Sequence, residues 1–306
     1  MLSLRIMLEY FHPWPNSAGF YVARERGWYA DAGLNVELCV PDPERGDSLQ
    51  HLLDGAVQLS VFPSNRLLVR RDLGQPLKGV AAINHAGLEA FQTLREFNIQ
   101  RPRDLMGKRL AMNPTPRGLA MVRDLVRKDG GDPDAVVIID AGARELRPEE
   151  LDAGLADASF GGYWAWEALM DSPVPAARRV VHPVNGWGAP AYHSYLLGAR
   201  EDWIAAHPEV LRALLAATAR GFESVAAEPL LAREAYERVI PYFPGALIER
   251  SLNHIAPTWL HEGRFGVQRQ ALIEPYAHWL HAHGILQHPE AWHSATTNDY
   301  LPGEAP

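Results

Sequence analysis

The first third of the chain alternates short apolar segments with amphipathic ones, and this alternation constrains the fold more than any other feature. In the opening segment, Leu2, Leu4, Ile6 and Leu8 fall on one face of an extended chain, which is the period of a β-strand. The same reasoning predicts strands at residues 34–38, 57–62 and 77–83, separated by helices at residues 17–30, 47–53 and 64–73. Repeated strand–helix–strand units predict an α/β fold with a mainly parallel sheet and helices on both faces.

A second α/β unit is predicted to begin near Arg101. Strands are expected at residues 108–112, 136–139 and 157–160. Thr115 is placed to cap a helix whose first residue is Pro116 and which runs to Lys128. The simplest topology inserts this unit into the first. The expected lobes are residues 1–93 with 194–306 (lobe 1) and residues 94–193 (lobe 2), with crossings near residues 90–97 and 190–197.

The last third of the chain is predicted to be helical. Helices are expected at residues 209–226, 230–239 and 268–282. Pro275 falls inside the last of these and is expected to kink or break it, because proline cannot donate a backbone hydrogen bond. The polar, proline-containing tail after His288 is expected to be loosely held.

Composition narrows the class of protein. The chain has 306 residues, of which 47% are hydrophobic, so it can bury the cores of two lobes. A net charge of −8, without any lysine- and arginine-rich run, argues against a nucleic-acid partner. Cys39 is the single cysteine, which excludes an intramolecular disulfide and a cysteine-based metal cluster. No stretch reaches the length of about 20 apolar residues that a transmembrane helix needs.

Ligands of open α/β sheets bind beyond the carboxyl ends of the strands, so the loops at those ends carry the candidate ligand-binding residues. The loop after the first strand is stiffened by two prolines and contains Tyr10, His12, Trp14 and Asn16. The next two loops of lobe 1 supply Phe62, Asn65, Arg66 and His85. Lobe 2 supplies Asn113, Thr115 and Arg117 at a helix start, and the return crossing supplies Trp187 and Tyr192.

Several of these residues also have a purely structural interpretation. The two helix starts would offer free N–H groups and positive potential to an anionic or carbonyl-bearing group. Ser64, however, fits equally well as a plain N-cap, and Arg117 could face solvent. Trp14 could pack between the lobes. Asn84, His85 and Glu89 are either hinge or pocket residues, or ordinary polar loop residues.

Particular segments of the chain resemble a known family. The run Tyr10-Phe11-His12-Pro13-Trp14-Pro15-Asn16, followed by Gly19-Phe20-Tyr21 and Gly27-Trp28-Tyr29, is similar to the opening of the type II periplasmic-binding-protein superfamily. The branch concerned holds alkanesulfonate receptors, thiamine-pyrimidine receptors and fungal pyrimidine synthases. The resemblance spans roughly residues 4–225 and is sharpest at Gly161-Gly162-Tyr163, with Glu167 four residues on. It implies two α/β lobes with a cleft between them and a hinge motion that encloses the ligand.

The Gly-Gly-Tyr element also indicates a ligand. In the formyl-aminopyrimidine receptors of this branch, this element and the following glutamate carry ligand contacts. Tyr163, Trp166 and Glu167 have the spacing that puts them on one helix face. A carboxylate there accepts from the amino group of an aminopyrimidine, and the aromatic rings stack. The resemblance therefore implies a thiamine pyrimidine precursor as ligand. The alternative to a ligand-binding role is that this segment is an ordinary helix start, in which Glu167 pairs with a surface arginine and the aromatic residues pack in a core.

Departures from the synthases indicate a binding protein rather than an enzyme. The fungal synthases carry a lysine for pyridoxal phosphate, a histidine and a cysteine-rich segment. This chain has Phe62 and Arg66 at the matching positions and one cysteine, so no cofactor and no metal are expected. The expected partners are the small ligand and the permease subunits of an ABC importer. The alternative is a cytoplasmic enzyme or ligand sensor of thiamine-related pyrimidine metabolism that uses His12, His85 or Glu167 as acid–base groups. The protein is expected to be extracytoplasmic if a leader was removed and cytoplasmic if Met1 is the native start.

Overall fold

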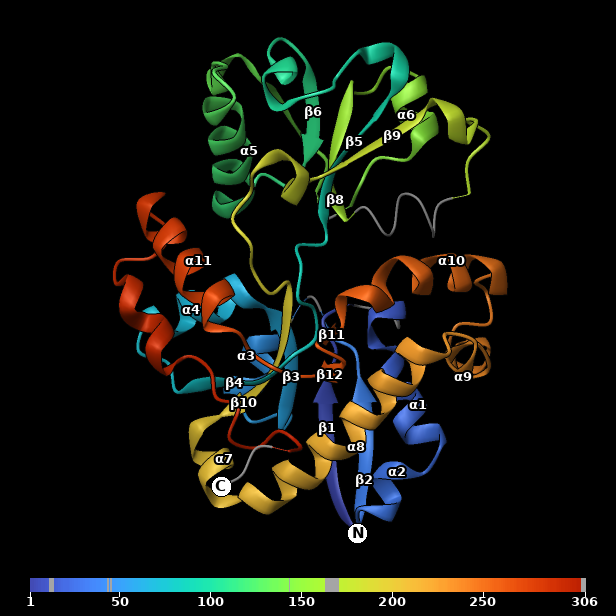
Figure 1. Ribbon diagram of the computed structural model, residues 1–306, viewed down its shortest axis with the longest axis vertical. Helices are drawn as coiled ribbons and strands as arrows, with labels where there is room; N and C mark the ends of the chain where they lie inside the picture. The colour runs from blue at the N-terminus through green and yellow to red at the C-terminus, as the bar shows by residue number, and fades with distance from the viewer. Residues whose placement is uncertain (11–13, 43, 45, 143, 163–170, 304–306) are drawn as a thin grey trace. The chain divides into compact units, whose positions relative to one another are not determined.

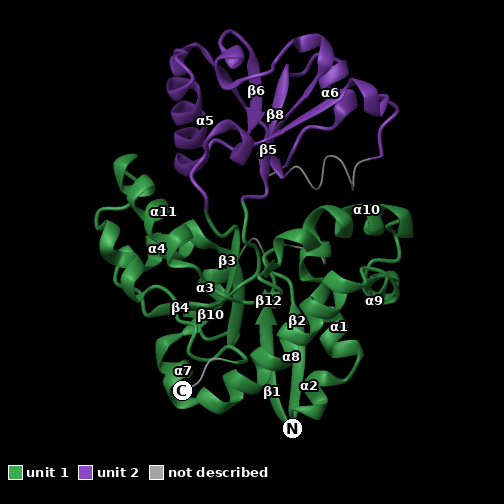
Figure 2. Ribbon diagram, in the orientation of Figure 1, with its two compact units in different colours: residues 1–86, 192–306 green, residues 87–191 purple. Residues whose placement is uncertain are grey.

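The computed structural model describes residues 1–10, 14–42, 44, 46–142, 144–162 and 171–303. The chain forms two compact units (Figures 1 and 2). Unit 1 comprises residues 1–86 and 192–306, and unit 2 comprises residues 87–191. The chain therefore passes from one unit to the other twice. No helix in the described part of the chain is long and apolar enough to cross a membrane.

Unit 1 is built on a five-stranded sheet in which four strands are parallel. Its strands are β1 (Leu2–Met7), β2 (Leu34–Cys39), β3 (Leu59–Pro63), β4 (Leu77–Ala82) and β10 (Tyr195–Arg200). Their spatial order is β2-β1-β3-β10-β4, and β10 runs antiparallel to both of its neighbours. Ile6 and Leu59, which lie opposite each other on β1 and β3, are fully buried, as the apolar alternation predicts.

Helices surround this sheet, and a short hairpin lies beside it (Figure 1). The helices are α1 (Ala18–Glu25), α2 (Trp28–Asp31), α3 (Ser48–Leu53), α4 (Ser64–Asp72), α7 (Glu201–Ala206), α8 (Pro208–Ala227), α9 (Leu231–Val239), α10 (Gly245–Ile255) and α11 (Gln270–Ala282). The hairpin consists of β11 (Leu260–His261) and β12 (Arg264–Phe265). In the packing, α1 lies against α8, and α4 contacts α11.

Unit 1 differs from the sequence prediction at two helices. The segment predicted as one helix at residues 17–30 is two helices, because Gly27 has a φ of 75° and separates α1 from α2. The predicted break at Pro275 was wrong, since α11 continues through this residue to Ala282. Ile273 and Tyr276 are buried on either side of Pro275, and their packing holds the helix together there.

The prediction of a loose tail was also wrong. The 3₁₀ helix η10 (Pro289–Ser294) is followed by residues that pair with β4, the edge strand of the sheet. The Gly79 N–H donates to the Ala295 carbonyl at 2.8 Å, and the Thr297 N–H donates to the Gly79 carbonyl at 2.9 Å. The tail therefore covers the open hydrogen-bonding edge of β4.

Unit 2 repeats the architecture of unit 1 on a smaller scale. Its elements are β5 (Glu89–Leu94), β6 (Arg109–Met112), α5 (Pro116–Lys128), β7 (Val137–Asp140), α6 (Pro148–Asp152), β8 (Ala158–Gly162) and β9 (Arg179–Pro183). The strand order is β7-β6-β8-β5-β9, and β5 runs antiparallel to both neighbours. Thr115 caps α5 by accepting from the Gly118 N–H at 3.1 Å, as predicted. In each unit, the antiparallel strand is the first one after a crossing, and the mainly parallel α/β fold is confirmed.

Candidate ligand-binding site

The predicted site residues are distributed over both units. Asn113, Thr115, Arg117 and Trp187 belong to unit 2, and the other described candidates belong to unit 1. Four predicted residues lie outside the described part of the chain: His12, Tyr163, Trp166 and Glu167.

Arg66 is paired with acidic residues of its own unit. It lies in the first turn of α4, and its Nη1 is 3.5 Å from Glu9 Oε1 and 3.6 Å from Asp47 Oδ2. Glu9 follows β1, and Asp47 is the N-cap of α3, so three chain segments meet at the carboxyl edge of the sheet. Arg66 is therefore engaged by carboxyl groups of unit 1.

Glu9 is a buried acid that the sequence analysis missed. Burial raises its pKa to about 7, against the opposing effect of the Arg66 charge. Its Oε2 lies 2.9 Å from the Ser48 hydroxyl oxygen, which lies 2.7 Å from the Val61 carbonyl oxygen. Ser48 has one hydroxyl proton and a carbonyl only accepts, so both hydrogen bonds form together only when Glu9 is protonated. An acidic residue just beyond a buried parallel strand was the signal that could have identified it.

Asn16 is held in a buried hydrogen-bond network. Its carboxamide exchanges two hydrogen bonds with that of Asn84, at 3.0 and 2.8 Å, and its Oδ1 accepts from the Trp259 indole N–H at 2.8 Å. Asn84 Nδ2 also donates to Thr258 Oγ1 at 2.8 Å. The network ties the loop after β1 to the end of β4 and to the segment before the hairpin. Trp259 carries no local sequence signal for this role.

The aromatic residues of the first loop pack within unit 1. The rings of Tyr10 and Trp14 lie 4.5 Å apart, and Trp14 meets Tyr195 edge-on at 5.5 Å. Trp14 is 1% exposed, and its carbonyl accepts from the Tyr236 hydroxyl at 2.6 Å. These contacts hold Tyr10 and Trp14 against the rest of unit 1.

His85 follows β4 and lies in a cluster of three imidazoles. Its ring is 5.1 Å from that of His193 and 5.6 Å from that of His261. Both ring nitrogens of His85 are buried without a hydrogen-bond partner in the described chain. The pKa of His85 is lowered to about 3, mainly by burial, with His193, His261 and Arg269 contributing to the same shift. A neutral imidazole offers one donor and one acceptor, so His85 is able to bind a polar ligand atom.

His193 is held in its neutral form by its hydrogen bonds and its burial. Its Nδ1 lies 2.9 Å from the Asn84 carbonyl, and its Nε2 accepts from the Arg269 N–H at 3.0 Å. This arrangement requires the proton on Nδ1, and burial lowers the pKa of His193 to about 4.

Three aromatic candidates are packed inside their own units. Phe62 has no exposed surface, and Tyr192 stacks on Tyr276 at 4.6 Å. In unit 2, Trp187 stacks on Phe91 at 4.8 Å. Asn65 is half-buried in the first turn of α4. A ligand-binding role for each of these residues stays a prediction.

Arg117 is paired with an acidic residue of unit 2. It lies in the first turn of α5, its side chain is 11% exposed, and its Nη1 donates to Glu89 Oε2. Glu89 begins β5 and lies opposite Gly162 of β8. Asn113 and Thr115 are exposed beside the start of α5. Both arginines that the sequence singled out are therefore engaged by carboxylates.

A second acid, Glu145, was also missed. It lies between β7 and α6, and its Oε1 accepts from the Gly162 N–H at 2.7 Å. Burial raises its pKa, and the Glu89 charge adds to this effect. No sequence signal identifies it, because its proximity to the Gly-Gly element arises only in the folded chain.

Known proteins resemble this chain in sequence. The sequence model of the NMT1/THI5-like family matches residues 14–232. The formylaminopyrimidine-binding protein of Halalkalibacterium halodurans is 26% identical over 300 residues, which cover 94% of this chain and 87% of that protein. The 4-amino-5-hydroxymethyl-2-methylpyrimidine phosphate synthase of Aspergillus parasiticus is 22% identical over 241 residues, which cover 76% of this chain and 70% of that protein.

Solved structures share the fold. The periplasmic aliphatic sulphonate binding protein SsuA of Escherichia coli matches with a TM-score of 0.72 at 14% sequence identity, covering 98% of this chain and 99% of that one. This match confirms the type II periplasmic-binding-protein fold predicted from the sequence. Because the matched segment covers more than half of its residues, the chain belongs to the NMT1/THI5-like family.

Proposed function

We propose that this chain is a solute-binding protein that binds an aminopyrimidine of the formylaminopyrimidine class and delivers it to the permease subunits of an ABC importer. The relative from Halalkalibacterium halodurans, similar over 94% of this chain, is named for such a ligand and supports the proposal. Delivery to a permease implies a location outside the cytoplasm.

The observation that carries this proposal is that the arginines at the carboxyl ends of the strands are already engaged by carboxyl groups. Arg66 lies beside Glu9 and Asp47, and Arg117 pairs with Glu89. A sulfonate needs cationic or N–H donors that are not already engaged, whereas an aminopyrimidine needs acceptors for its amino hydrogens. The described strand ends therefore favour an amino-bearing heterocycle over an anion.

The residues that we assign to ligand binding come from both the sequence and the structure. Glu167 is proposed to accept from the ring amino group, with Tyr163 and Trp166 stacking beside it. His85 is proposed to bind a second polar atom, because its buried ring nitrogens have no partner in the described chain.

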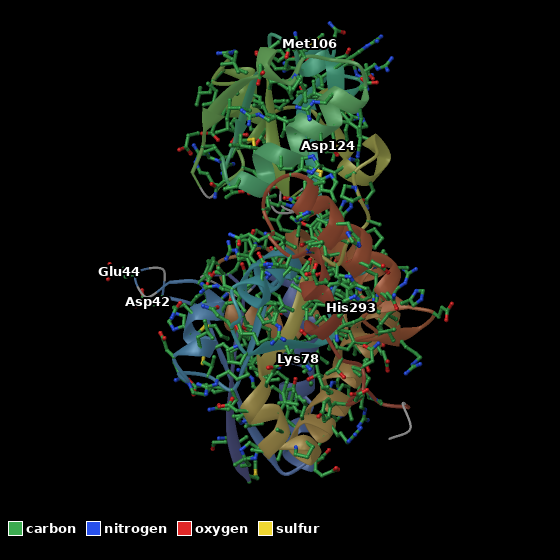
Figure 3. The ribbon with its side chains drawn as sticks, turned by 90° about the vertical axis from the view of Figure 1, so that its left-hand side faces the viewer. Asp42, Glu44, Lys78, Met106, Asp124 and His293 are labelled. Atoms are coloured by element: carbon green, nitrogen blue, oxygen red, sulfur yellow. The ribbon has the colours of Figure 1, made fainter. Side chains whose placement is uncertain are left out.

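A synthase is the second candidate, because the Aspergillus relative is named as one. The positions of the lysines disfavour it. Lys78, which is labelled in Figure 3, lies near the amino end of β4. Its Nζ is 3.6 Å from Glu201 Oε1. Lys108 directly precedes β6, and Lys128 ends α5, where it is 2.7 Å from Asp124. Each lies at the end of its element opposite the candidate residues, so none is placed to hold an aldehyde cofactor.

Titration calorimetry of the wild-type protein tests the ligand class. Formylaminopyrimidine should bind at one molecule per chain, and an alkanesulfonate should produce no saturable heat. Tighter binding of the sulfonate would contradict the proposal.

A further inference from the structure

Glu145 lies beside β8, and both of its neighbours in the chain make hydrogen bonds. The guanidinium of Arg144 donates to both carboxylate oxygens of Glu150, at 2.8 and 2.9 Å. The Leu146 N–H donates to the buried hydroxyl oxygen of Ser159 on β8 at 3.1 Å. The Leu146 hydrogen bond therefore attaches the backbone just after Glu145 to β8.

The Glu145 side chain occupies the space that a side chain at Gly161 would need. A Cβ atom added at Gly161 would lie 2.5 Å from Glu145 Cγ and 2.6 Å from its Oε1. The next residue, Gly162, donates its backbone N–H to the same Oε1 at 2.7 Å. The two glycines at the end of β8 thus make room for a carboxyl group and bind it. This gives the Gly-Gly element a physical role that its sequence does not reveal.

No cationic side chain in the described chain pairs with Glu145. Its charged form is favoured only by backbone amides, those of Gly162 and of Glu145 itself, while burial and the charge of Glu89 oppose ionisation. The nearby Arg117 is engaged by Glu89. A ligand that donates hydrogen bonds to this carboxyl group would offset the cost of its burial.

We propose that Glu145 is a ligand-binding residue of unit 2 that pairs with the ring amino group and the adjacent ring nitrogen of an aminopyrimidine. This inference rests on the function proposed above and adds a second carboxyl group to it. Oε2 accepts from the amino group, while Oε1, which also accepts from the Gly162 N–H, shares a single proton with the ring nitrogen. The pairing forms whether that proton belongs to the acid or to the pyrimidine, so a carboxyl group of raised pKa suits it.

Glu145→Gln tests the proposal with little structural change. The variant keeps an oxygen to accept from Gly162, but it replaces the second oxygen by an NH₂ group that repels the amino group of the ligand. Calorimetry should show affinity for formylaminopyrimidine falling about 10- to 100-fold. Affinity for the same pyrimidine with its ring amino group replaced by hydrogen should change much less. Glu96→Gln is the matched control, because Glu96 is an exposed acid of unit 2 that pairs with Arg178, and it should bind both compounds like the wild type.

Gly161→Ala provides an independent variant, since its new methyl group must displace the Glu145 carboxyl group. It should show the same selective loss for the amino compound. Equal losses for both compounds, or unchanged affinity in folded Glu145→Gln, would overturn the role of Glu145 while leaving the proposed function intact. Failure of the wild-type protein to bind formylaminopyrimidine would overturn both.

Discussion

The carboxamides of Asn16 and Asn84 hydrogen-bond to each other twice, at 3.0 and 2.8 Å, although 68 residues separate them in the chain. Asn16 is 2% exposed and Asn84 is fully buried. Trp259 and Thr258 complete the network. A buried network whose members are all paired holds its loops in one arrangement. These two loops carry most of the candidate ligand groups of unit 1.

Asn16→Ala should destabilise the protein by about 2–4 kcal/mol. The substitution leaves the Asn84 carboxamide and the Trp259 indole N–H buried without their partner, and each such group costs about 1–3 kcal/mol. Denaturant unfolding measures the change. The control Asn65→Ala, at a half-buried position, should cost less than about 0.5 kcal/mol. Similar losses for the two variants would show that the network contributes little.

Glu9 should make the folded protein less stable as the pH rises. Burial raises its pKa from 4.5 to about 7, so between these values the folded protein binds more protons than the unfolded chain. The stabilisation from protonated Glu9 is complete below the unfolded pKa and is lost as the pH rises through the folded one. The loss amounts to about 3 kcal/mol at most. His85 and His193 act oppositely, because their lowered pKa values cost stability as the pH falls.

Comparison with Glu9→Gln separates these effects. Glutamine keeps a donor toward Ser48 but does not titrate. The unfolding free energy of the wild type should therefore fall relative to that of the variant between about pH 4.5 and 7, by about 3 kcal/mol. A difference that stays constant with pH would mean that Glu9 is ionised throughout.

No lysine should form an imine with pyridoxal phosphate. The chain has only three lysines, Lys78, Lys108 and Lys128. Each lies at the end of its strand or helix that is opposite the candidate ligand-binding residues. Borohydride treatment followed by peptide mass spectrometry should find no stoichiometric adduct at a single lysine. Such an adduct would support a synthase instead.

Ligand binding should compact the protein if the hinge hypothesis is correct. The chain passes between the units twice, at residues 86–87 and 191–192. Backbone rotation at these crossings would absorb the closure. Small-angle scattering should give a smaller radius of gyration with saturating formylaminopyrimidine than without it. Identical radii would rule out closure on the ligand.

Local signals predicted the order of the elements well. The apolar alternation of β1 and the pair Thr115 and Pro116 at the start of α5 depend on neighbouring residues alone, and both predictions are confirmed. The break at Gly27 was missed because glycine is also tolerated inside helices. The disruptive effect of Pro275 on helix α11 was overestimated, because the packing of its neighbours outweighs one lost hydrogen bond.

The candidate site was predicted less completely from the sequence than the order of the helices and strands. Arg66 and Arg117 were identified, but the carboxylates that engage them come from other chain segments. Glu9 lies just beyond a buried parallel strand, a local signal that was overlooked, whereas its raised pKa and that of Glu145 depend on burial by distant residues. The hydrogen bond between Asn16 and Trp259 likewise joins the two separate chain segments that form unit 1.

The most direct test of the central claim measures binding and turnover in one experiment. The wild-type protein is titrated with formylaminopyrimidine in a calorimeter, and the ligand is then recovered after denaturation and identified by mass spectrometry. A solute-binding protein should bind one ligand per chain and return it unchanged. Recovery of a chemically altered pyrimidine, or the absence of binding alongside saturable binding of an alkanesulfonate, would contradict the account.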